Sequence, residues 1–408
     1  MVNDLALQRS KYKHLTDDEW RWFLQQVEGR ERTADKLPTF AEIEDWWYPV
    51  RLSCEQCSSE LAARYKAEII TPYTLHHTPS TMVDLTGGYG VDTYFLSKQF
   101  EHTDDVEQNA ELCRIAEHNF QLKIKNEKLK IHNTTAEDFL QKSQIVNRKS
   151  SNRKLEYDLI FLDPARRDSH GGKVFRLEDC TPNVVELLPT LLAHLTPNGR
   201  LMLKLSPMLD LTQALKELSV GSLQWSVYVV AIKNEVKEVL LISGGTGQIT
   251  AIDLDKKDQA FVFTREEESR SDLGAVLQQS GLTAKRSNSP KDGQEKQPLF
   301  LFEPNAAILK AGAYKLVAER FGLSKLDVNT HLYVSETLVA DFPGRVWKID
   351  SEIKNQKLPL TNANVLVRNY PLTPEQLKKK LHLRDGGTDF VIGCRVNGKP
   401  TLFRAERV

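Results

Sequence analysis

From residue 81 onward, short apolar runs that favour strands alternate with amphipathic stretches that favour helices. Because a strand, a helix and a second strand in succession form a crossover that lays the two strands parallel, this order predicts a doubly wound α/β sheet. The 408 residues suffice for such a sheet and for further domains. The strand-like runs are 81–86, 101–109, 128–135, 157–166 and 200–207, and the helix-like stretches are 91–100, 110–122, 137–143 and 183–199.

The alternation ends with two strand-like runs, 225–234 and 237–245, that only a short turn separates. A parallel pair needs a long crossover, so these two strands are expected to pair antiparallel. The sequence therefore predicts a Rossmann-like sheet of seven strands that closes in an antiparallel hairpin.

Helices precede this region, and smaller mixed elements follow it. Thr16 is placed to cap the helix in "TDDEWRWFLQQVEGR", and Pro72 is predicted to end a second helix that starts near Ser58. The segment around 283–297 is rich in Ser, Pro, Gly and charged residues, which is typical of a linker. We expect a helical N-terminal domain (1–78), the α/β domain (79–265), a linker (266–297) and two small α+β domains (298–350 and 355–408).

Composition excludes several classes of protein. Lysine plus arginine and aspartate plus glutamate number 55 each, so overall charge indicates no particular partner. No apolar run is long enough to span a bilayer and residues 1–30 show no secretory pattern, so we expect a cytoplasmic protein with no membrane partner. Cys54 and Cys57 have metal-like spacing but lack further ligands, which predicts ordinary helical cysteines and no metal site.

A glycine-dense turn, "MVDLTGGYGVD", follows the first strand at residues 82–92. Thr93 stands where a dinucleotide-binding fingerprint needs its third glycine, and no Gly-Lys-Ser/Thr follows as a phosphate-binding loop requires. Asp92 would also repel a pyrophosphate at the start of the next helix. The turn is better suited to a ligand that carries an amine and a sulfonium charge.

The stretch "DLTGGYGVD" resembles the first motif of class I S-adenosylmethionine-dependent methyltransferases. The resemblance implies that Asp84, Gly87, Gly88 and Gly90 face the methionine part of this cofactor. It implies a ribose-binding acid at Glu107, at the spacing of about 20 residues that nucleotide-binding folds show. In the family, the segment after the third strand contacts adenine, and the candidates at that position here are Glu137 and Asp138.

The most apolar strand ends in "LDPARR", which resembles the Asp-Pro-Pro-aromatic motif of nucleic-acid amino-methyltransferases. The resemblance implies catalytic roles for Asp163, Pro164 and Arg166: the acid and a backbone carbonyl accept hydrogen bonds from the target amine. Ala165 and Arg166 replace the second proline and the aromatic, and an arginine plane can stack on a base or hold a phosphate. The 5-methyluridine enzymes need a cysteine after the next strand, and "LMLKLSPML" has none.

Two basic regions are candidates for substrate binding. The first follows the Asp-Pro motif and consists of Arg166, Arg167, Lys173 and Arg176. The second is the segment 353–408, with 11 Lys or Arg residues against 4 Asp or Glu residues. Such a region forms either a phosphate-binding surface or a merely solvated face, and both interpretations stay open.

The segments "EPNAAILKAGAY", "THLYVSE", "FPGR" and "DGG" resemble a bacterial family of class I methyltransferases with a ferredoxin-like and a THUMP-like domain. Because THUMP domains in other enzymes bind tRNA, the resemblance implies an RNA methyltransferase, with tRNA ahead of rRNA as the partner. Two alternatives remain: a methyltransferase acting on a small molecule or a protein, and a non-catalytic RNA-binding protein.

Overall fold

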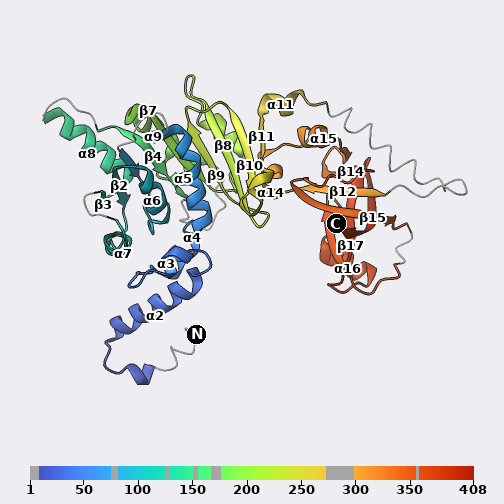
Figure 1. Cartoon of the computed structure of the whole chain (residues 1–408), viewed down its shortest axis with the longest axis horizontal. Coiled ribbons are helices and arrows are strands. Elements are labelled where there is room, and N and C mark those ends of the chain that lie inside the picture. The colour runs from blue at the N-terminus through green and yellow to red at the C-terminus, as the bar shows by residue number, and fades with distance from the viewer. Residues whose placement is uncertain are drawn as a thin grey trace, which may run out of the picture. The chain divides into compact units, whose positions relative to one another are not determined.

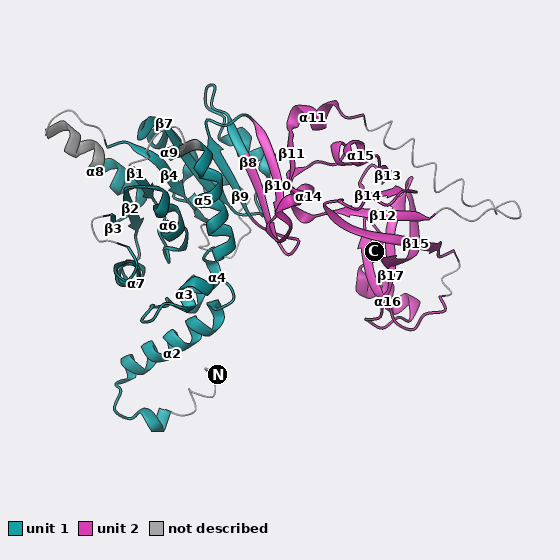
Figure 2. Ribbon diagram, in the orientation of Figure 1, with its two compact units in different colours: residues 1–226, 238–246 teal, residues 227–237, 247–408 magenta. Residues whose placement is uncertain are grey.

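The computed structural model describes residues 9–74, 81–124, 128–149, 155–166, 176–272, 298–354 and 358–408 (Figure 1). It divides into two compact units, shown in Figure 2: unit 1 comprises residues 1–226 and 238–246, and unit 2 comprises residues 227–237 and 247–408. Most of the predicted linker lies outside the described residues. Within the described part of the chain, no helix has the length and apolar character needed to cross a membrane.

The described part of unit 1 begins with helices: η1 (Arg9–Tyr12), α2 (Asp17–Thr33), α3 (Pro38–Ala41), α4 (Arg51–Gln56) and α5 (Glu60–Thr74). The capping role predicted for Thr16 is confirmed, because its hydroxyl accepts from the Glu19 N–H and Glu19 reciprocates. The helix stop predicted at Pro72 is wrong: Pro72 lies inside α5, within its last turn, where only one backbone hydrogen bond is lost.

The N-terminal helices share a hydrophobic core with the helices that follow the first two strands of the sheet. Phe40 stacks on Trp46 with ring centroids 4.3 Å apart and meets Tyr94 edge-on at 5.0 Å. Aromatic pairs of this kind stabilise the contact beyond the burial of apolar area. The buried members of this core are Leu37, Phe40, Trp46, Tyr48, Cys54, Ala63, Tyr89, Val91, Tyr94, Phe95, Ile115, Ala116 and Phe120.

The strands of unit 1 are ordered β9-β7-β4-β1-β2-β3. Their bounds are β1 (Thr81–Asp84), β2 (His102–Glu107), β3 (Leu129–Asn133), β4 (Tyr157–Leu162), β7 (Leu195–Leu205) and β9 (Glu235–Ser243), and the helices are α6 (Val91–Leu96), α7 (Ala110–Gln121), α8 (Ala136–Lys149), α9 (Val184–Ala193) and α10 (Leu211–Glu217). All neighbouring pairs from β7 to β3 are parallel, whereas β7 and β9 are antiparallel. The predicted α/β sheet is therefore confirmed. The order of the strands reverses at β1, which lies between β2 and β4, and sheets of this kind bind ligands at such a topological switch point.

The predicted closing hairpin is also confirmed. Lys233 and Asn234, with φ of 53° and 60°, form the two-residue turn between β8 (Trp225–Ile232) and β9. Two left-handed residues are what the tightest hairpin turn requires. Two short strands beyond the predicted seven follow: β10 (Gln248–Asp253) runs parallel to β8, and β11 (Phe261–Thr264) runs antiparallel to β10.

The C-terminal part of unit 2 is a second, mostly antiparallel sheet with the order β13-β14-β12-β15-β18-β17-β16. Its strands are β12 (Leu299–Pro304), β13 (Ser324–Asp327), β14 (Thr330–Ser335), β15 (Gly344–Glu352), β16 (Asn364–Arg368), β17 (Asp389–Val396) and β18 (Lys399–Arg407). The helices α14 (Ala306–Ala311) and α15 (Leu316–Phe321) follow β12, and α16 (Pro374–Leu381) connects the parallel strands β16 and β17. The antiparallel pairing of β15 with β18 joins both predicted small domains in one sheet.

Candidate active site

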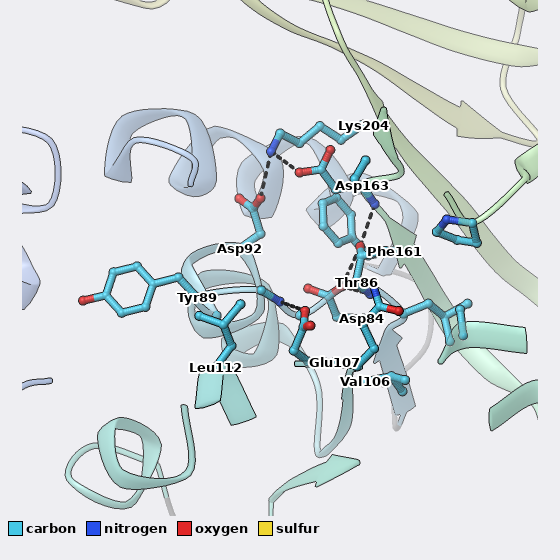
Figure 3. Close-up of a pocket in the computed structure, with 18 of the residues that line it drawn as sticks. Asp84, Thr86, Tyr89, Asp92, Val106, Glu107, Leu112, Phe161, Asp163 and Lys204 are labelled. Atoms are coloured by element: carbon cyan, nitrogen blue, oxygen red, sulfur yellow. Dashed lines mark hydrogen bonds and ion pairs between the residues drawn. The ribbon is translucent and has the colours of Figure 1, made fainter. Parts of the chain in front are cut away.

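A cavity of about 300 Å³ opens at the carboxyl ends of β1, β2 and β4 in unit 1 (Figure 3). Its wall combines the glycine turn, the ends of these strands, the start of α8 and part of the N-terminal helical segment. The ionisable carboxyl and ammonium groups that line it are Asp84, Asp92, Glu107, Glu137, Asp163 and Lys204. Among the described residues, five carboxyl groups thus face one ammonium group.

The glycine turn has a backbone that larger residues would not accept. Gly88 and Gly90 have φ of 57° and 81°, in the left-handed region. A Cβ at Gly87 would lie 2.1 Å from Asp105 Oδ1, and one at Gly90 would lie 2.5 Å from the Phe120 ring. A Cβ at Gly88 would make only an ordinary contact, 3.7 Å from the Thr86 carbonyl oxygen, and Gly88 lines the cavity. Its bare backbone is therefore the part of the turn that a ligand can approach.

Asp84 is buried at the end of β1 and belongs to a chain of hydrogen bonds. Its Oδ2 accepts from the Thr93 hydroxyl at 2.6 Å, and that hydroxyl oxygen also lies 3.1 Å from Oδ1 of the fully buried Asp105. One hydroxyl hydrogen cannot serve two carboxylates, so one acid must be protonated. Burial, with the nearby Asp84 charge, raises the pKa of Asp105 well above its usual range, so Asp105 is the neutral acid that donates to Thr93.

Burial also raises the pKa of Asp84, to about 7. The carboxyl oxygen Oδ1 accepts from the Thr86 N–H at 2.9 Å, and the Thr86 hydroxyl accepts in turn from the Asp163 N–H at 2.7 Å. Thr86 therefore connects the ends of β1 and β4 across the cavity floor (Figure 3). Asp84 is poised to ionise when a cation arrives beside it.

Glu107 lies at the end of β2, where its carboxylate reaches the glycine turn. Its two oxygens accept from the Gly88 N–H at 2.8 Å and from the Asn109 N–H at 2.7 Å. A carboxylate has further lone pairs after two such bonds, so it can still accept from a ligand's hydroxyl groups. Of the two candidates in the next segment, Glu137 lines the cavity, while Asp138 is not among its lining residues.

Some residues of "LDPARR" line the cavity and others do not. Asp163 lines the cavity with its side chain 38% exposed, Pro164 is not among the lining residues, and the backbone of Arg166 pairs with Cys180 in a two-stranded ribbon, β5 (Ala165–Arg166) with β6 (Cys180–Thr181). Arg167 and Lys173 lie outside the described residues. Arg176 is exposed, pairs with Glu178 at 2.9 Å and does not line the cavity.

The sequence analysis missed a series of buried ions that ends in the cavity. Lys66 on α5 has a completely buried side chain, and its ammonium lies 2.7 Å from both carboxylate oxygens of Glu238 and 3.2 Å from Asp92. Asp92 lies 3.7 Å from Lys204, whose ammonium donates a hydrogen bond to Asp163. We call this series the ion chain: Glu238, Lys66, Asp92, Lys204 and Asp163.

Neighbouring charges govern ionisation within the ion chain. Burial alone would raise the pKa of Asp92, but Lys66 and Lys204 hold it below its ordinary value. Burial alone would lower the pKa of Lys204, but Asp163 and Asp92 raise it above its ordinary value. Lys204 is therefore a permanent cation in the cavity wall and cannot serve as a base. The sequence signal was a lysine inside the apolar strand "RLMLKLSP".

The N-terminal segment also contributes to the cavity, through Ser53, Gln56, Cys57 and Ser58. The Ser58 hydroxyl donates to Asp92 at 2.7 Å, which adds a further partner to the ion chain. Cys54 lies on α4 as predicted, and burial raises its pKa to about 12, so its thiol is not reactive at neutral pH.

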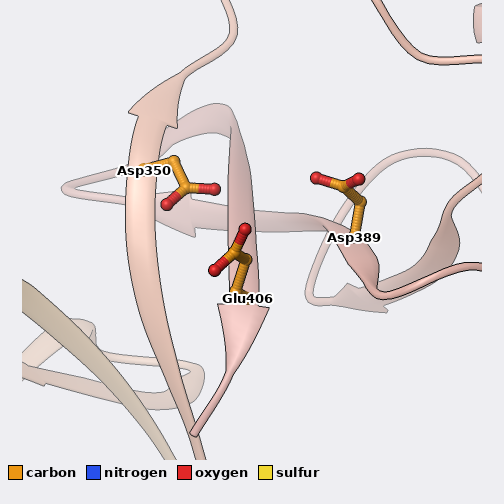
Figure 4. Close-up of side chains that lie close together, drawn as sticks. All are labelled: Asp350, Asp389 and Glu406. Atoms are coloured by element: carbon orange, nitrogen blue, oxygen red, sulfur yellow. The ribbon is translucent and has the colours of Figure 1, made fainter.

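A second group of carboxylates lies in unit 2, where Asp350, Asp389 and Glu406 come together (Figure 4). The Arg404 guanidinium donates to Asp389 at 2.8 Å and lies 3.9 Å from Asp350, so its charge offsets part of theirs. We regard this group as an ion-pair cluster on the surface of the sheet.

Comparisons with known proteins agree with this architecture. A family described as a ferredoxin-like domain matches residues 300–343, and a family described as THUMP domain-like matches residues 344–407. A solved structure from Porphyromonas gingivalis W83, assigned as a methyltransferase, is 30% identical, covers 97% of this chain and 92% of its own, and has a TM-score of 0.74. No curated protein matches this chain.

Two shorter solved structures match less than half of the chain. One, from Streptococcus mutans, is assigned as a methyltransferase and is in complex with SAH; it is 15% identical over 43% of this chain and 95% of its own, with a TM-score of 0.30. The other is a SAM-dependent methyltransferase from Agrobacterium tumefaciens, 18% identical over 46% of this chain and 62% of its own, with a TM-score of 0.32.

A parallel sheet that closes in an antiparallel hairpin, with an acid-rimmed glycine turn at its switch point, defines the class of SAM-dependent methyltransferases. The structure from Porphyromonas gingivalis W83, which covers 97% of this chain, narrows this class to one family. The chain belongs to the methyltransferase family that joins this fold to a ferredoxin-like and a THUMP-like domain.

Proposed function

We propose that the cavity binds S-adenosylmethionine and that the protein transfers the cofactor's methyl group to RNA. The observation that carries the cofactor assignment is the charge of the cavity wall, where five carboxyl groups of the described part of the chain oppose one ammonium. Such a wall favours a ligand with a sulfonium and an amine and disfavours a pyrophosphate.

Each part of the cofactor has a suitable partner. Asp84 and the bare backbone at Gly88 suit the methionine end, since the carboxyl can ionise beside the amine. Glu107 suits the ribose, because it lies at the end of β2 and keeps free lone pairs. Glu137 is the better of the two candidates for the adenine, as it lines the cavity and Asp138 does not.

When bound, S-adenosylmethionine supplies a methyl group on a positively charged sulfur that leaves readily. The protein therefore needs mainly to align the acceptor and to take its proton. We assign Asp163 as the group that takes the proton. Its side chain is 38% exposed in the cavity, its backbone N–H donates to the Thr86 hydroxyl, and Lys204 donates to its carboxylate. Arg166, Arg167, Lys173 and Arg176 remain proposed substrate contacts.

RNA is the proposed acceptor because of the THUMP-like domain and its basic composition. Three basic residues of α16 and the turn after it are exposed: Lys379, Lys380 and Arg384. Exposed lysines and arginines bind phosphates and release counterions, which gives RNA binding its salt dependence. We place tRNA ahead of rRNA, and transfer to a small molecule or a protein is the alternative.

Calorimetry with S-adenosylmethionine tests the cofactor site. The wild-type protein should bind, Asp84→Asn and Glu107→Gln should each weaken binding by roughly 10–150-fold, the loss of one charged hydrogen bond, and the exposed Glu101→Gln should bind like the wild type. No binding to the wild type would refute the assignment.

Methyl labelling tests the acceptor. Purified protein with radiolabelled S-adenosylmethionine should label total tRNA from a strain that lacks the protein, and should not label tRNA from the parent strain. Label that enters protein or small molecules only would exclude RNA.

A further inference from the structure

We infer that Lys204 and Asp163 together recognise the molecule that receives the methyl group. The edge they recognise is neutral and carries a hydrogen-bond acceptor beside an N–H group, as a nucleobase does. This inference rests on the proposed function and adds the chemistry by which its acceptor is selected. The starting point is that both side chains line the cavity and are hydrogen-bonded to each other (Figure 3).

The pair offers one donor and one acceptor to the cavity. Lys204 has three N–H donors, and within the described residues only Asp163 receives a hydrogen bond from them. Asp163 uses Oδ2 for this bond, and its Oδ1 has no hydrogen-bond partner among the described residues. A hydrogen-bond donor on Lys204 and a hydrogen-bond acceptor on Asp163 therefore lie next to each other in the cavity wall, where the substrate of methylation must enter.

The rest of the ion chain fixes this geometry from behind. Asp92 lies 3.7 Å from the Lys204 ammonium and is itself held by Lys66 and Ser58. The side chain of Lys204 is only 12% exposed, so it cannot swing away into solvent. The Lys204 ammonium is thus a preorganised donor, and a ligand that binds to it costs little side-chain entropy of Lys204.

This pair discriminates between classes of acceptor. A protein amine in its protonated form would meet the Lys204 charge, and a carboxylate would meet the Asp163 charge. A lone hydroxyl carries its donor and its acceptor on a single oxygen, so it matches the two adjacent groups less well than an edge that carries them on two neighbouring atoms. The edge of a nucleobase satisfies both at once, and the THUMP-like domain favours a nucleobase over a protein carboxamide.

The test compares Lys204→Gln, Lys204→Arg and Asp163→Asn with Lys216→Gln, which changes an exposed lysine outside the cavity. Methyl transfer from radiolabelled S-adenosylmethionine to tRNA from a strain lacking the protein gives kcat and KM, and calorimetry gives cofactor affinity. For Lys204→Gln we expect kcat/KM for tRNA to fall roughly 10–150-fold, as for one charged hydrogen bond, with cofactor affinity within about threefold of the wild type. Lys204→Arg should recover most of the loss, and Lys216→Gln should lose nothing.

A binding measurement without turnover completes the design. Saturation-transfer NMR with the four ribonucleoside monophosphates and SAH-loaded protein should detect at least one of them in the wild type and in Lys216→Gln, but none in Lys204→Gln or Asp163→Asn. If Lys204→Gln lowers the melting temperature, the test rests on the other two variants. Lys204→Arg should then keep most of the activity, and Asp163→Asn should bind none of the nucleotides.

The two failures are distinguishable. A wild-type protein that does not bind S-adenosylmethionine refutes the proposed function itself. Normal cofactor binding together with unchanged kcat/KM in Lys204→Gln overturns the role of Lys204. Label that enters protein carboxamides overturns the choice of a nucleobase as the methyl acceptor. Both outcomes leave the cofactor site standing.

Discussion

Replacement of Lys66 by methionine tests the energetics of the ion chain. Methionine keeps the length and much of the volume of the lysine side chain but removes its charge. The completely buried ammonium of Lys66 lies 2.7 Å from both oxygens of Glu238 and 3.2 Å from Asp92. Its loss leaves Glu238 as a buried carboxylate with no cation in salt-bridge contact among the described residues, and it removes one of the two cations beside Asp92.

Removal of one partner from a buried ion pair destabilises proteins by about 3–5 kcal/mol, because the other charge stays buried without compensation. We expect a loss of this size in unfolding free energy for Lys66→Met. For a unit of this length, the melting temperature should fall by roughly 6–20 °C. The exposed Lys123→Met should change the unfolding free energy by less than about 0.5 kcal/mol.

The double variant Lys66→Met/Glu238→Gln separates the ion pair from packing. Glutamine removes the orphaned charge, so the double variant should be more stable than Lys66→Met by at least about 1 kcal/mol. Urea unfolding followed by tryptophan fluorescence measures all three proteins. A double variant as unstable as Lys66→Met, or a Lys66→Met loss below about 1 kcal/mol, would refute the reasoning.

Three other features of the molecule give further predictions. Because the pKa of Asp84 is raised to about 7, a cation that binds beside Asp84 should make it release a proton, so affinity for S-adenosylmethionine should rise with pH through 7. Calorimetry in buffers of different ionisation enthalpy should detect the released proton. Asp84→Asn should abolish this release. The same raised pKa adds stability that is complete below the ordinary pKa of about 4 and is lost as pH rises to about 7. In thermal melts, Gly87→Ala should cost about 1–3 kcal/mol because its Cβ would lie 2.1 Å from Asp105 Oδ1, and an unchanged melting temperature would contradict this. For RNA binding, Lys379→Gln and Lys380→Gln should each lower the slope of log affinity against log salt by about one, whereas a slope unchanged in both would exclude this face.

The sequence could predict those parts of the site that depend on local strand and turn patterns. Asp84 and Glu107 each end a strand, and the parallel sheet brings those ends to one edge, so their nearness followed from the alternation alone. The hairpin of β8 and β9 was predictable for the same reason, since a short connection permits only one pairing. The strands β10 and β11 were missed because they are short and follow a glycine-rich turn without a strong apolar run.

The ion chain could not be predicted, because its contacts join distant parts of the chain. Lys66 and Glu238 are separated by 172 positions, and no periodicity links a lysine on an N-terminal helix to an acid on a late strand. Asp105 was missed for another reason: its role depends on Thr93 and Asp84, which approach it only when β1 and β2 pair. Charged residues inside apolar strands, such as Lys204 and Glu238, are the sequence signal that deserved a site hypothesis.

Stability does not explain why the ion chain is buried. Well-packed apolar residues of similar volume are often as stabilising as a buried ion pair, or more so, so a protein selected only for stability has no need of one. The chain instead runs from the completely buried Lys66 to the half-exposed Asp163, and its last three members line the cavity. Each internal charge lies next to charges of opposite sign, which keeps Lys204 protonated and holds it in one position. The buried members therefore act as positioning residues for the Lys204–Asp163 pair, and the structure ties the N-terminal helix α5 to the acceptor end of the site through Lys66.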